Sequence, residues 1–407
     1  MKLKADILVN PKSIHFSVLF ALFSSIVFVW ACKSPSHQKK VSGSDYKVAA
    51  YYWPAYHDEP RWRTFFNGTE GEWEIIRNAT PKYDGHRQPR VPVWGYEDET
   101  IPAVMEKKID AAVSHGVNVL AFDWYWYEGQ PFLEDCINNG FLKAKNNDKI
   151  EFYIMWANHA ATTLWDKRRS HKVDTIWDGA VDRANFDIIV DRIIKKYMMH
   201  PSYFKIDGKP VFSIYELGSL IRGLGGIQQT RSALDSFREK VKKAGFPDVH
   251  IQAILWNNIP DTQSNVPGDM TKTQNNTIEA VGINSLTNYQ YVHLSAPVDD
   301  YIEWADKAIS NWPKWEKEFS VPFFPHVAID WDTNSRFHSY KPFIKKNATP
   351  EVFKQYLIKA KQYLDAHPNQ PKMVTINSWN EWSEGSYLEP DSVNGMKYLE
   401  AVREVFK

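Results

Sequence analysis

Short apolar runs alternate with stretches of helical periodicity along most of the chain, from Lys47 onward. Gly116 and Gly245 are expected to end two of the helices, and Thr349-Pro350 is expected to begin the last one. The apolar runs predict strands at Lys47–Tyr52, Val117–Trp124, Ile150–Trp156, Pro210–Ile214, Val249–Leu255, Val281–Asn284, Phe323–Ile329 and Met373–Ile376. The periodic stretches predict helices at Ile101–His115, Phe132–Lys145, Phe186–Tyr197, Leu234–Ala244, Tyr301–Trp315 and Val352–Leu364.

Eight strands, each followed by a helix or a long loop, predict an α/β fold. We expect a single (β/α)8 barrel of the TIM type with long loops, over residues 47–407. An open, doubly wound sheet is the alternative, and such a sheet usually has a glycine-rich phosphate-binding turn after its first strand. The first strand here continues instead into an aromatic segment, Tyr51–Tyr56. This loop favours the barrel.

The residues just after the predicted strands are rich in aromatic and amide side chains. Active sites of (β/α)8 barrels form at these strand ends, and aromatic rings provide surfaces on which sugars stack. Some of the 17 tryptophans are expected simply to fill the core. We predict substrate-binding roles at these strand ends for Tyr52, Trp53, Asp123, Trp124, Trp126, Trp156, Asn158, Tyr215, Asn257 and Trp331.

The charge of the chain does not favour nucleic acid or an anionic lipid surface as a partner. There are 49 basic and 49 acidic residues, so the formal net charge is zero. Aromatic residues make up 14% of the chain, which suits a stacking cleft. We therefore expect an oligo- or polysaccharide as the partner and no nucleic acid. We also expect a monomer.

The N-terminus has the pattern of an export signal over residues 1–31. Lysines precede an apolar stretch that ends at Val29-Trp30-Ala31-Cys32. This pattern predicts a bacterial lipoprotein with Cys32 acylated, although Trp30 stands where small residues are usual. Residues 32–46 would then form a flexible tether. An uncleaved transmembrane anchor is the alternative. Either reading predicts a location in the bacterial cell envelope, periplasmic or on the outer surface.

The only other cysteine is Cys136, so removing Cys32 leaves no intramolecular pair. Cys136 lies in an apolar periodic stretch and is expected to be a small core residue. The chain has no Cys/His cluster with the spacing of a zinc site and no calcium-loop pattern. We expect no cofactor and no metal.

The segment Asn377–Gly385 follows the last predicted strand and contains two carboxylates three residues apart, Glu381 and Glu384. Cleavage of a glycosidic bond uses two carboxyl groups that face one bond. The pair lies between Trp379 and Trp382. A surface loop with two solvated glutamates is the alternative interpretation. The preceding strand and the aromatic neighbours favour a catalytic pair.

Three segments together resemble the glycoside hydrolase family 99-like proteins, which include the WbsX-type domain. They are Tyr51–Pro54, Phe122–Trp126, and Trp379–Gly385 with Leu388-Glu389-Pro390. The resemblance implies a (β/α)8 barrel and retaining, endo-type cleavage of α-linked glycans. By motif position it implies that Glu381 is the base that deprotonates the substrate 2-hydroxyl and that Glu384 is the general acid/base. We assign substrate contacts to Asn380, Trp382 and Glu389 as well.

One position departs from this resemblance. Ser383 stands where the endo-mannosidases have histidine, so mannose does not follow as the substrate. The residues also leave two routes open, attack by the substrate 2-hydroxyl and direct attack by a carboxylate.

The leading hypothesis is an envelope-anchored, retaining, endo-acting glycoside hydrolase that acts on mannose-type or related hexose or deoxyhexose chains. Two alternatives belong to other classes. One is a surface glycan-binding lipoprotein without catalysis. The other is a polysaccharide-assembly protein associated with glycosyl transfer.

Overall fold

The computed structural model describes residues 45–65, 68–256 and 259–407. Within them, eight parallel strands form one sheet in the order β12-β9-β8-β4-β2-β1-β14-β13. With the helices that follow them, these strands confirm the predicted (β/α)8 barrel. The strands are β1 Lys47–Tyr52, β2 Val119–Tyr127, β4 Glu151–Trp156, β8 Lys209–Ile214, β9 His250–Ile254, β12 Ser285–Thr287, β13 His326–Ala328 and β14 Met373–Asn377.

One segment closes the sheet into a barrel. Leu286 of β12 exchanges backbone hydrogen bonds with residues 322–324, at 2.9 Å to the carbonyl of Pro322 and 2.8 Å from the amide of Phe324. The same segment continues into β13, which pairs in parallel with β14. Strand β1 lies between β2 and β14, so it joins the early and late strands of the chain.

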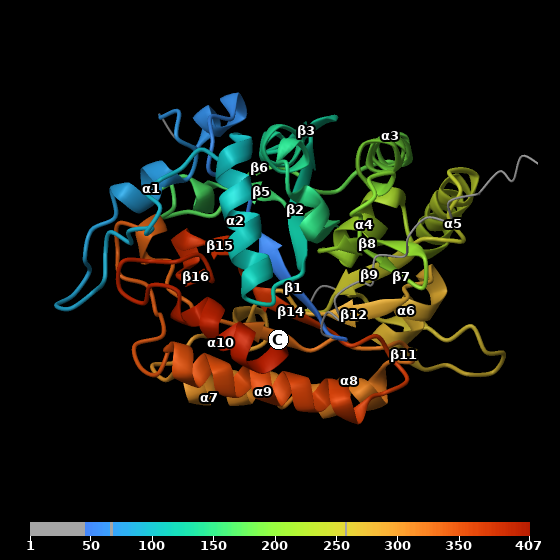
Figure 1. The fold of residues 1–407 in the computed structure, drawn as a ribbon. Coiled ribbons are helices and arrows are strands. Elements are labelled where there is room, and N and C mark those ends of the chain that lie inside the picture. Colours follow the sequence, from blue (N-terminus) through green and yellow to red (C-terminus); the bar gives the residue numbers. More distant parts are fainter. Residues whose placement is uncertain (1–44, 66–67, 257–258) are drawn as a thin grey trace, which may run out of the picture. The chain divides into compact units, whose positions relative to one another are not determined.

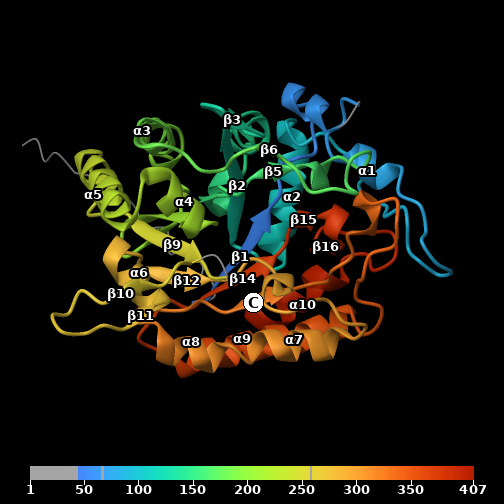
Figure 2. The same ribbon diagram turned by 180° about the vertical axis from the view of Figure 1, so that it is seen from behind.

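Helices surround the strands, and β1 lies in the interior of the arrangement (Figures 1 and 2). α9 and α10 pack side by side (Figure 1). The helices are α1 Trp73–Arg77, α2 Pro102–Ser114, α3 Arg183–Ile193, α4 Leu217–Leu224, α5 Ile227–Lys243, α6 Gln274–Val281, α7 Tyr301–Ile309, α8 Trp312–Glu318, α9 Pro350–Ala366 and α10 Lys397–Phe406. Small two-stranded additions are β3 Gln130–Phe132 on β2, β7 Lys205–Ile206 on β8, and the pairs β5 Ala161–Thr162 with β6 Thr175–Trp177 and β10 Thr262–Gln263 with β11 Lys272–Thr273.

The predicted helix ends are confirmed where their local chemistry is clear. Gly116 and Gly245 follow α2 and α5 with φ of 88° and 99°, a backbone region that glycine adopts without steric cost. Thr349 caps α9, where its Oγ1 accepts a hydrogen bond from the amide of Val352 at 3.4 Å.

The strand predicted at Val281–Asn284 is wrong. Thr273 caps α6 at its start and Gly282 ends it with φ of 82°, so Val281 is the last residue of a helix. The strand, β12, begins at Ser285. Val281, the first residue of the predicted strand, lies on the buried face of α6 together with Ile278.

Two predicted helices are interrupted. Phe132 ends strand β3 and Leu133 has φ of 62°, so no helix begins at Phe132. A π-helical turn at Cys136–Gly140 and a 3-10 turn at Phe141–Lys143 follow. Residues 301–315 form two helices, α7 and α8, which are separated at Ser310 and Asn311.

The predicted signal, Cys32 and most of the tether lie outside the described residues. Within residues 45–65, 68–256 and 259–407, no helix combines the length and the apolar character that a membrane span requires.

Candidate active site

Glu381 and Glu384 both lie on a small hairpin that follows β14. Its strands are β15 Asn380–Glu381 and β16 Ser386–Tyr387, joined by a 3-10 turn over Trp382–Glu384. Gly385 closes the turn with φ of 74°, and a Cβ there would lie 2.6 Å from Nη2 of Arg90. The backbone conformation therefore favours glycine after Glu384, and any side chain there would displace the Arg90 guanidinium.

Side chains around the hairpin fix the position of Glu381. The backbone amide of Glu381 donates to Oγ of Ser378 at 2.7 Å, and that hydroxyl donates to the carbonyl of Ser386 at 2.7 Å. The side-chain amide of Asn380 pairs with Trp53, accepting from its backbone N–H and donating to its carbonyl, both at 2.8 Å. Asn380 thus ties the hairpin to the end of β1.

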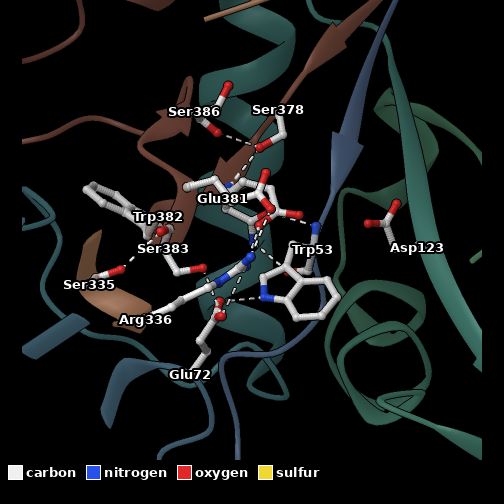
Figure 3. Close-up of polar contacts among 12 residues, drawn as sticks. Trp53, Glu72, Asp123, Ser335, Arg336, Ser378, Glu381, Trp382, Ser383 and Ser386 are labelled. Carbon is white, nitrogen blue, oxygen red and sulfur yellow. Dashed lines mark hydrogen bonds and ion pairs between the residues drawn. The ribbon is translucent and has the colours of Figure 1, made fainter. Parts of the chain in front are cut away.

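One guanidinium, that of Arg336, contacts three carboxylates. Nη1 lies 2.9 Å from Oε1 of Glu384, and Nη2 lies 3.3 Å from Oε1 of Glu72 and 3.5 Å from Oε2 of Glu381. Figure 3 shows Arg336 reaching between Glu72 and Glu381. Arg336 ends a 3-10 turn, Asn334–Arg336, in the loop after β13.

Glu72 contacts both Arg336 and the turn of the hairpin. Its carboxylate is buried and accepts from the indole N–H of Trp53 at 2.7 Å and from the hydroxyl of Ser383 at 2.8 Å. Ser383, the position that departs from the resemblance, therefore helps to hold Glu72 where that carboxylate contacts Arg336.

The two hairpin glutamates differ in burial and in partners. Glu381 is 5% exposed and accepts from the hydroxyl of Tyr289 at 2.8 Å, whereas Glu384 is 12% exposed and its Oε2 has no hydrogen-bond partner. Burial raises the pKa of both carboxyls, and the pKa of Glu381 is raised further by the charge of Glu384. Arg336 lowers the pKa of both.

The glutamates line a cavity of about 290 Å³ at the C-terminal ends of the barrel strands. Among the predicted substrate-binding residues, Trp53, Asp123 and Tyr215 line it too. The other lining side chains are mostly aromatic or apolar and include Tyr125, Met155, His159, Leu164, Trp165, Trp256 and Tyr289. Aromatic walls around two carboxyl groups are an arrangement suited to binding and cleaving a sugar chain.

Several predicted residues lie on the other side of their strands. Side chains alternate along a strand, and on β2 Asp123 and Tyr125 face the cavity while Trp124 and Trp126 face the helices. The indole N–H of Trp124 donates to Glu134 at 2.9 Å, and that of Trp126 donates to Asn185 at 3.2 Å. Tyr52, Trp156 and Asn158 also point away from the cavity. The hydroxyl of Tyr52 donates to Glu99, and Trp156 packs on Phe186. The side-chain amide of Asn158 pairs with the backbone of Glu216.

Three further predicted residues, of which Asn380 and Trp382 belong to the hairpin, are buried and do not line the cavity. Asn380 contacts Trp53 as described, Trp382 stacks on Tyr387 at 3.8 Å, and Glu389 accepts from the indole N–H of Trp382 at 2.8 Å. Nζ of Lys108 lies 2.6 Å from Glu389 and 2.5 Å from Glu99, in a fully buried ion-pair cluster.

Trp331 is half-buried and lines a separate hollow of about 410 Å³. Asn257 lies outside the described residues. A larger cavity, of about 530 Å³, is lined by Arg90, Asp330, Asp332 and Tyr387 among others, and by neither hairpin glutamate. The smaller cavity is therefore the candidate active site.

Sequence reasoning missed Arg336, Glu72 and Tyr289. Tyr289 follows β12, so placing that strand at 285–287 instead of 281–284 would have pointed to it. Arg336 and Glu72 lie in long loops after β13 and β1, and no local pattern marks them. No group of three or more His, Cys, Asp or Glu residues in the described part of the chain is arranged to hold a metal ion.

The chain matches the family described as Glycosyltransferase WbsX over residues 48–402. An uncharacterized protein WxcX from Xanthomonas campestris pv. campestris is 26% identical over 366 residues, which cover 88% of this chain and 49% of the relative. The chain thus spans about half the length of this curated relative.

Solved structures show the same fold. The GH99 endo-alpha-mannosidase from Bacteroides thetaiotaomicron aligns with a TM-score of 0.55 and 15% identity over 89% of this chain and 97% of that one. A glycoside hydrolase-like protein aligns with a TM-score of 0.55 and 16% identity over 92% and 97%. With the family match covering most of its length, the chain belongs to the WbsX family and has a GH99-like barrel.

Proposed function

We propose that this protein is a retaining, endo-acting glycoside hydrolase that cleaves α-linked glycans of mannose-type or related hexose or deoxyhexose units. The observation that carries the proposal is the pair Glu381 and Glu384, which share the Arg336 guanidinium in a cavity with aromatic walls. Two carboxyl groups at one sugar-sized cavity are what glycosidic cleavage requires. The fold of the GH99 endo-alpha-mannosidase supports the endo-type action.

In the proposed reaction Glu381 removes the proton of the substrate 2-hydroxyl while that oxygen attacks the anomeric carbon. Glu384 gives its proton to the leaving oxygen, so the glycosidic bond breaks and a 1,2-anhydro sugar forms. Glu384 then takes a proton from water, which opens the anhydro ring at the anomeric carbon, and Glu381 returns its proton to the 2-oxygen. Two inversions at that carbon give net retention.

The partners of each carboxyl support these roles. Glu384 accepts from Arg336 through Oε1, which leaves Oε2 without a partner to carry the acid proton. Glu381 accepts from Tyr289 and lies near Arg336, and both donors stabilise the anion that a base requires. A general acid needs a raised pKa, and burial raises that of Glu384. Burial and the charge of Glu384 raise the pKa of Glu381 as well, so its role as base depends on Tyr289 and Arg336 to hold the anion.

Transfer from a nucleotide sugar is the function that the family description suggests. A diphosphate donor needs cationic partners. Among the described residues that line the cavity, Arg336 is the one lysine or arginine, and three carboxylates already engage it. This charge pattern supports hydrolysis of a neutral glycan rather than binding of a diphosphate.

We also propose that the protein is exported and anchored to the envelope through acylated Cys32. The signal-like N-terminal sequence supports this proposal. Expression of the wild type and of Cys32→Ala with a radiolabelled fatty acid tests it. Equal incorporation of label in the two proteins would contradict acylation at Cys32.

Digestion of a library of α-linked glycans, with analysis of the released products, tests the catalytic proposal. Glu381→Gln and Glu384→Gln are each expected to lower kcat by about 10²- to 10⁴-fold, the range for losing one acid or base. On an aryl glycoside, whose leaving group needs no proton, Glu384→Gln should recover much of its first-step rate while Glu381→Gln should not.

The matched control is Glu239→Gln, a change at an exposed glutamate of α5. It should leave product release unchanged. Full activity in both hairpin variants on every cleaved glycan would rule out the assignment. Glycan binding without product release in the wild type would favour the non-catalytic binding protein instead.

A further inference from the structure

The hydroxyl of Tyr289 lies between two carboxyl groups. Its oxygen is 2.7 Å from Oδ2 of Asp123 and 2.8 Å from Oε1 of Glu381. A phenol has one hydrogen to donate, so it serves one carboxylate only, and the second short contact needs a hydrogen on the other carboxyl. The three groups together therefore hold two protons, the phenolic one and one carboxyl proton.

The charges nearby decide which carboxyl keeps that proton. Arg336 lies 3.5 Å from Glu381 and favours the anion there. Asp123 forms no ion pair with any lysine, arginine or histidine in the described part of the chain. It is 1% exposed, on the central part of β2. Figure 3 shows it across the site from Arg336.

Most of the titratable groups around Asp123 are acids, and the basic groups that line the same cavity are Arg336 and His159. The glutamates are Glu381 and Glu384, on the hairpin after β14. The tyrosines are Tyr51 on β1, Tyr125 on β2, Tyr153 on β4, Tyr215 after β8 and Tyr289 after β12. Burial raises the pKa of Asp123, a hydrogen bond donated by Tyr289 would lower it, and the charge of Glu384 raises it further when Glu384 is ionised.

The second oxygen of Asp123 gives an independent argument. Oδ1 is buried and has no hydrogen-bond partner. An ionised carboxylate oxygen in that position would lose its hydration with nothing in return, whereas the carbonyl oxygen of a neutral acid tolerates burial at a much smaller cost.

We propose that Asp123 is a positioning residue which, as a neutral acid, donates its proton to the oxygen of Tyr289, so that the Tyr289 hydroxyl donates in turn to an anionic Glu381. This inference rests on the proposed role of Glu381 as base. It explains how a buried carboxyl next to three other carboxyls is kept ionised.

Infrared difference spectroscopy on the free protein tests where the proton lies. The spectrum of the wild type minus that of Asp123→Asn at neutral pH should contain the carbonyl band of a protonated carboxyl. A difference that contains only carboxylate bands would overturn the proposal. Carbon-13 labelling of all aspartates in an Asp330→Asn variant repeats the test with Asp123 intact, should Asp123→Asn fail to fold.

Kinetics give a second readout that a purely structural role would not produce. The acidic limb of kcat/KM against pH reports protonation of the base in the free enzyme. An asparagine can donate to Tyr289 as the neutral acid does, so Asp123→Asn should leave that limb in place. If Asp123 were the anion, removing its charge would lower the pKa of Glu381. The acidic limb would then shift to lower pH by a unit or more, which is about a tenfold or larger fall in the proton affinity of Glu381.

Tyr289→Phe is the matched comparison. It removes the donor to Glu381, so kcat/KM should fall by about 10- to 100-fold, the range for one hydrogen bond to a charged group, and the acidic limb should move to higher pH. Adding Asp123→Asn to Tyr289→Phe should change neither value further. The infrared result does not depend on turnover, so a protein that hydrolyses no glycan still reports whether Asp123 is protonated.

Discussion

Nη1 of Arg336 lies 2.9 Å from Oε1 of Glu384, and the same guanidinium reaches Glu381 and Glu72. A single cation thus offsets the charge of three buried acids. The protonation state of each carboxyl depends on how the other two share that cation. Replacing Arg336 or one of the three glutamates should therefore shift the pH dependence of activity as well as lower the activity.

Replacing Arg336 with alanine removes this cation. Because Arg336 lowers the pKa of Glu381 and of Glu384, its loss should raise both, and both limbs of kcat/KM against pH should move to higher pH. At the original optimum, activity should fall by about 100-fold or more. Arg222→Ala is the control, since Arg222 forms an exposed pair with Asp178. A lower rate with unmoved limbs would contradict this account.

Replacing Glu72 with glutamine should move the limbs the opposite way. The charge of Glu72 raises the pKa of both hairpin glutamates, so its removal should lower both and shift the profile to lower pH. Trp53 and Ser383 donate to different oxygens of Glu72, so glutamine keeps only one of these acceptors. Its oxygen can accept from Trp53 while its amide donates to the Ser383 hydroxyl, so folding should be retained. Measurement of kcat/KM over the full pH range checks the sign, and a shift to higher pH would refute it.

A substrate that lacks the 2-hydroxyl at the scissile sugar separates the two possible routes. Attack by that hydroxyl predicts no turnover and no covalent enzyme adduct with the 2-deoxy analogue of any glycan found to be cleaved. Mass spectrometry of the intact protein after incubation checks this outcome. A trapped glycosyl ester on either glutamate would favour direct displacement.

Lys108 should matter for stability more than any exposed lysine. It is buried between Glu99 and Glu389, at 2.5 and 2.6 Å, so Lys108→Met would leave two buried carboxyls without their cation. The free energy of unfolding should fall by about 3–5 kcal/mol. Lys149→Met breaks an exposed pair with Asp110 and should cost far less, because water screens that pair. Urea denaturation of both variants, followed by circular dichroism, measures the difference.

Asp330 should make stability depend on pH near neutrality. Burial raises its pKa to about 7, above the value of about 3.9 for an unfolded chain. The folded state then binds the proton more tightly, so its contribution to stability is complete below about pH 4 and is lost as pH rises through 7. The loss is up to about 1.4 kcal/mol per pH unit.

Asp330→Asn lacks this loss, so its Tm should rise relative to that of the wild type as pH increases from 4 to 7. Differential scanning calorimetry at several pH values checks the trend. Parallel Tm curves for the two proteins would show that Asp330 titrates normally in the folded state.

The sequence was sufficient to predict the barrel because its strands are buried on both faces and appear as continuous apolar runs. It failed at β12, where the buried face of α6 and its glycine cap stand directly before a three-residue strand. A strand that short carries too few residues to show a pattern of its own. The error concealed Tyr289, which follows it.

The candidate site was predictable where it is local in sequence. Glu381 and Glu384 are three residues apart and come from one hairpin, so their pairing could be read directly. The charges that control them come from loops far away in the chain, and no short-range pattern links Glu72 to Arg336. To decide which strand-end residues line the cavity, one must know which of the alternating side chains of each strand point inward. Asp123 faces the cavity, and its neighbour Trp124 faces the helices.

The position of β14 has a consequence for fragments of this protein. β14 pairs with β1 on one side and β13 on the other, and it leads directly into the hairpin that bears Glu381 and Glu384. A chain cut before β14 loses the strand that lies between β1 and β13 in the barrel. It loses Glu381 and Glu384 at the same time. Proteolysis or premature termination there should yield an unfolded, inactive product and not a stable barrel with uncontrolled activity.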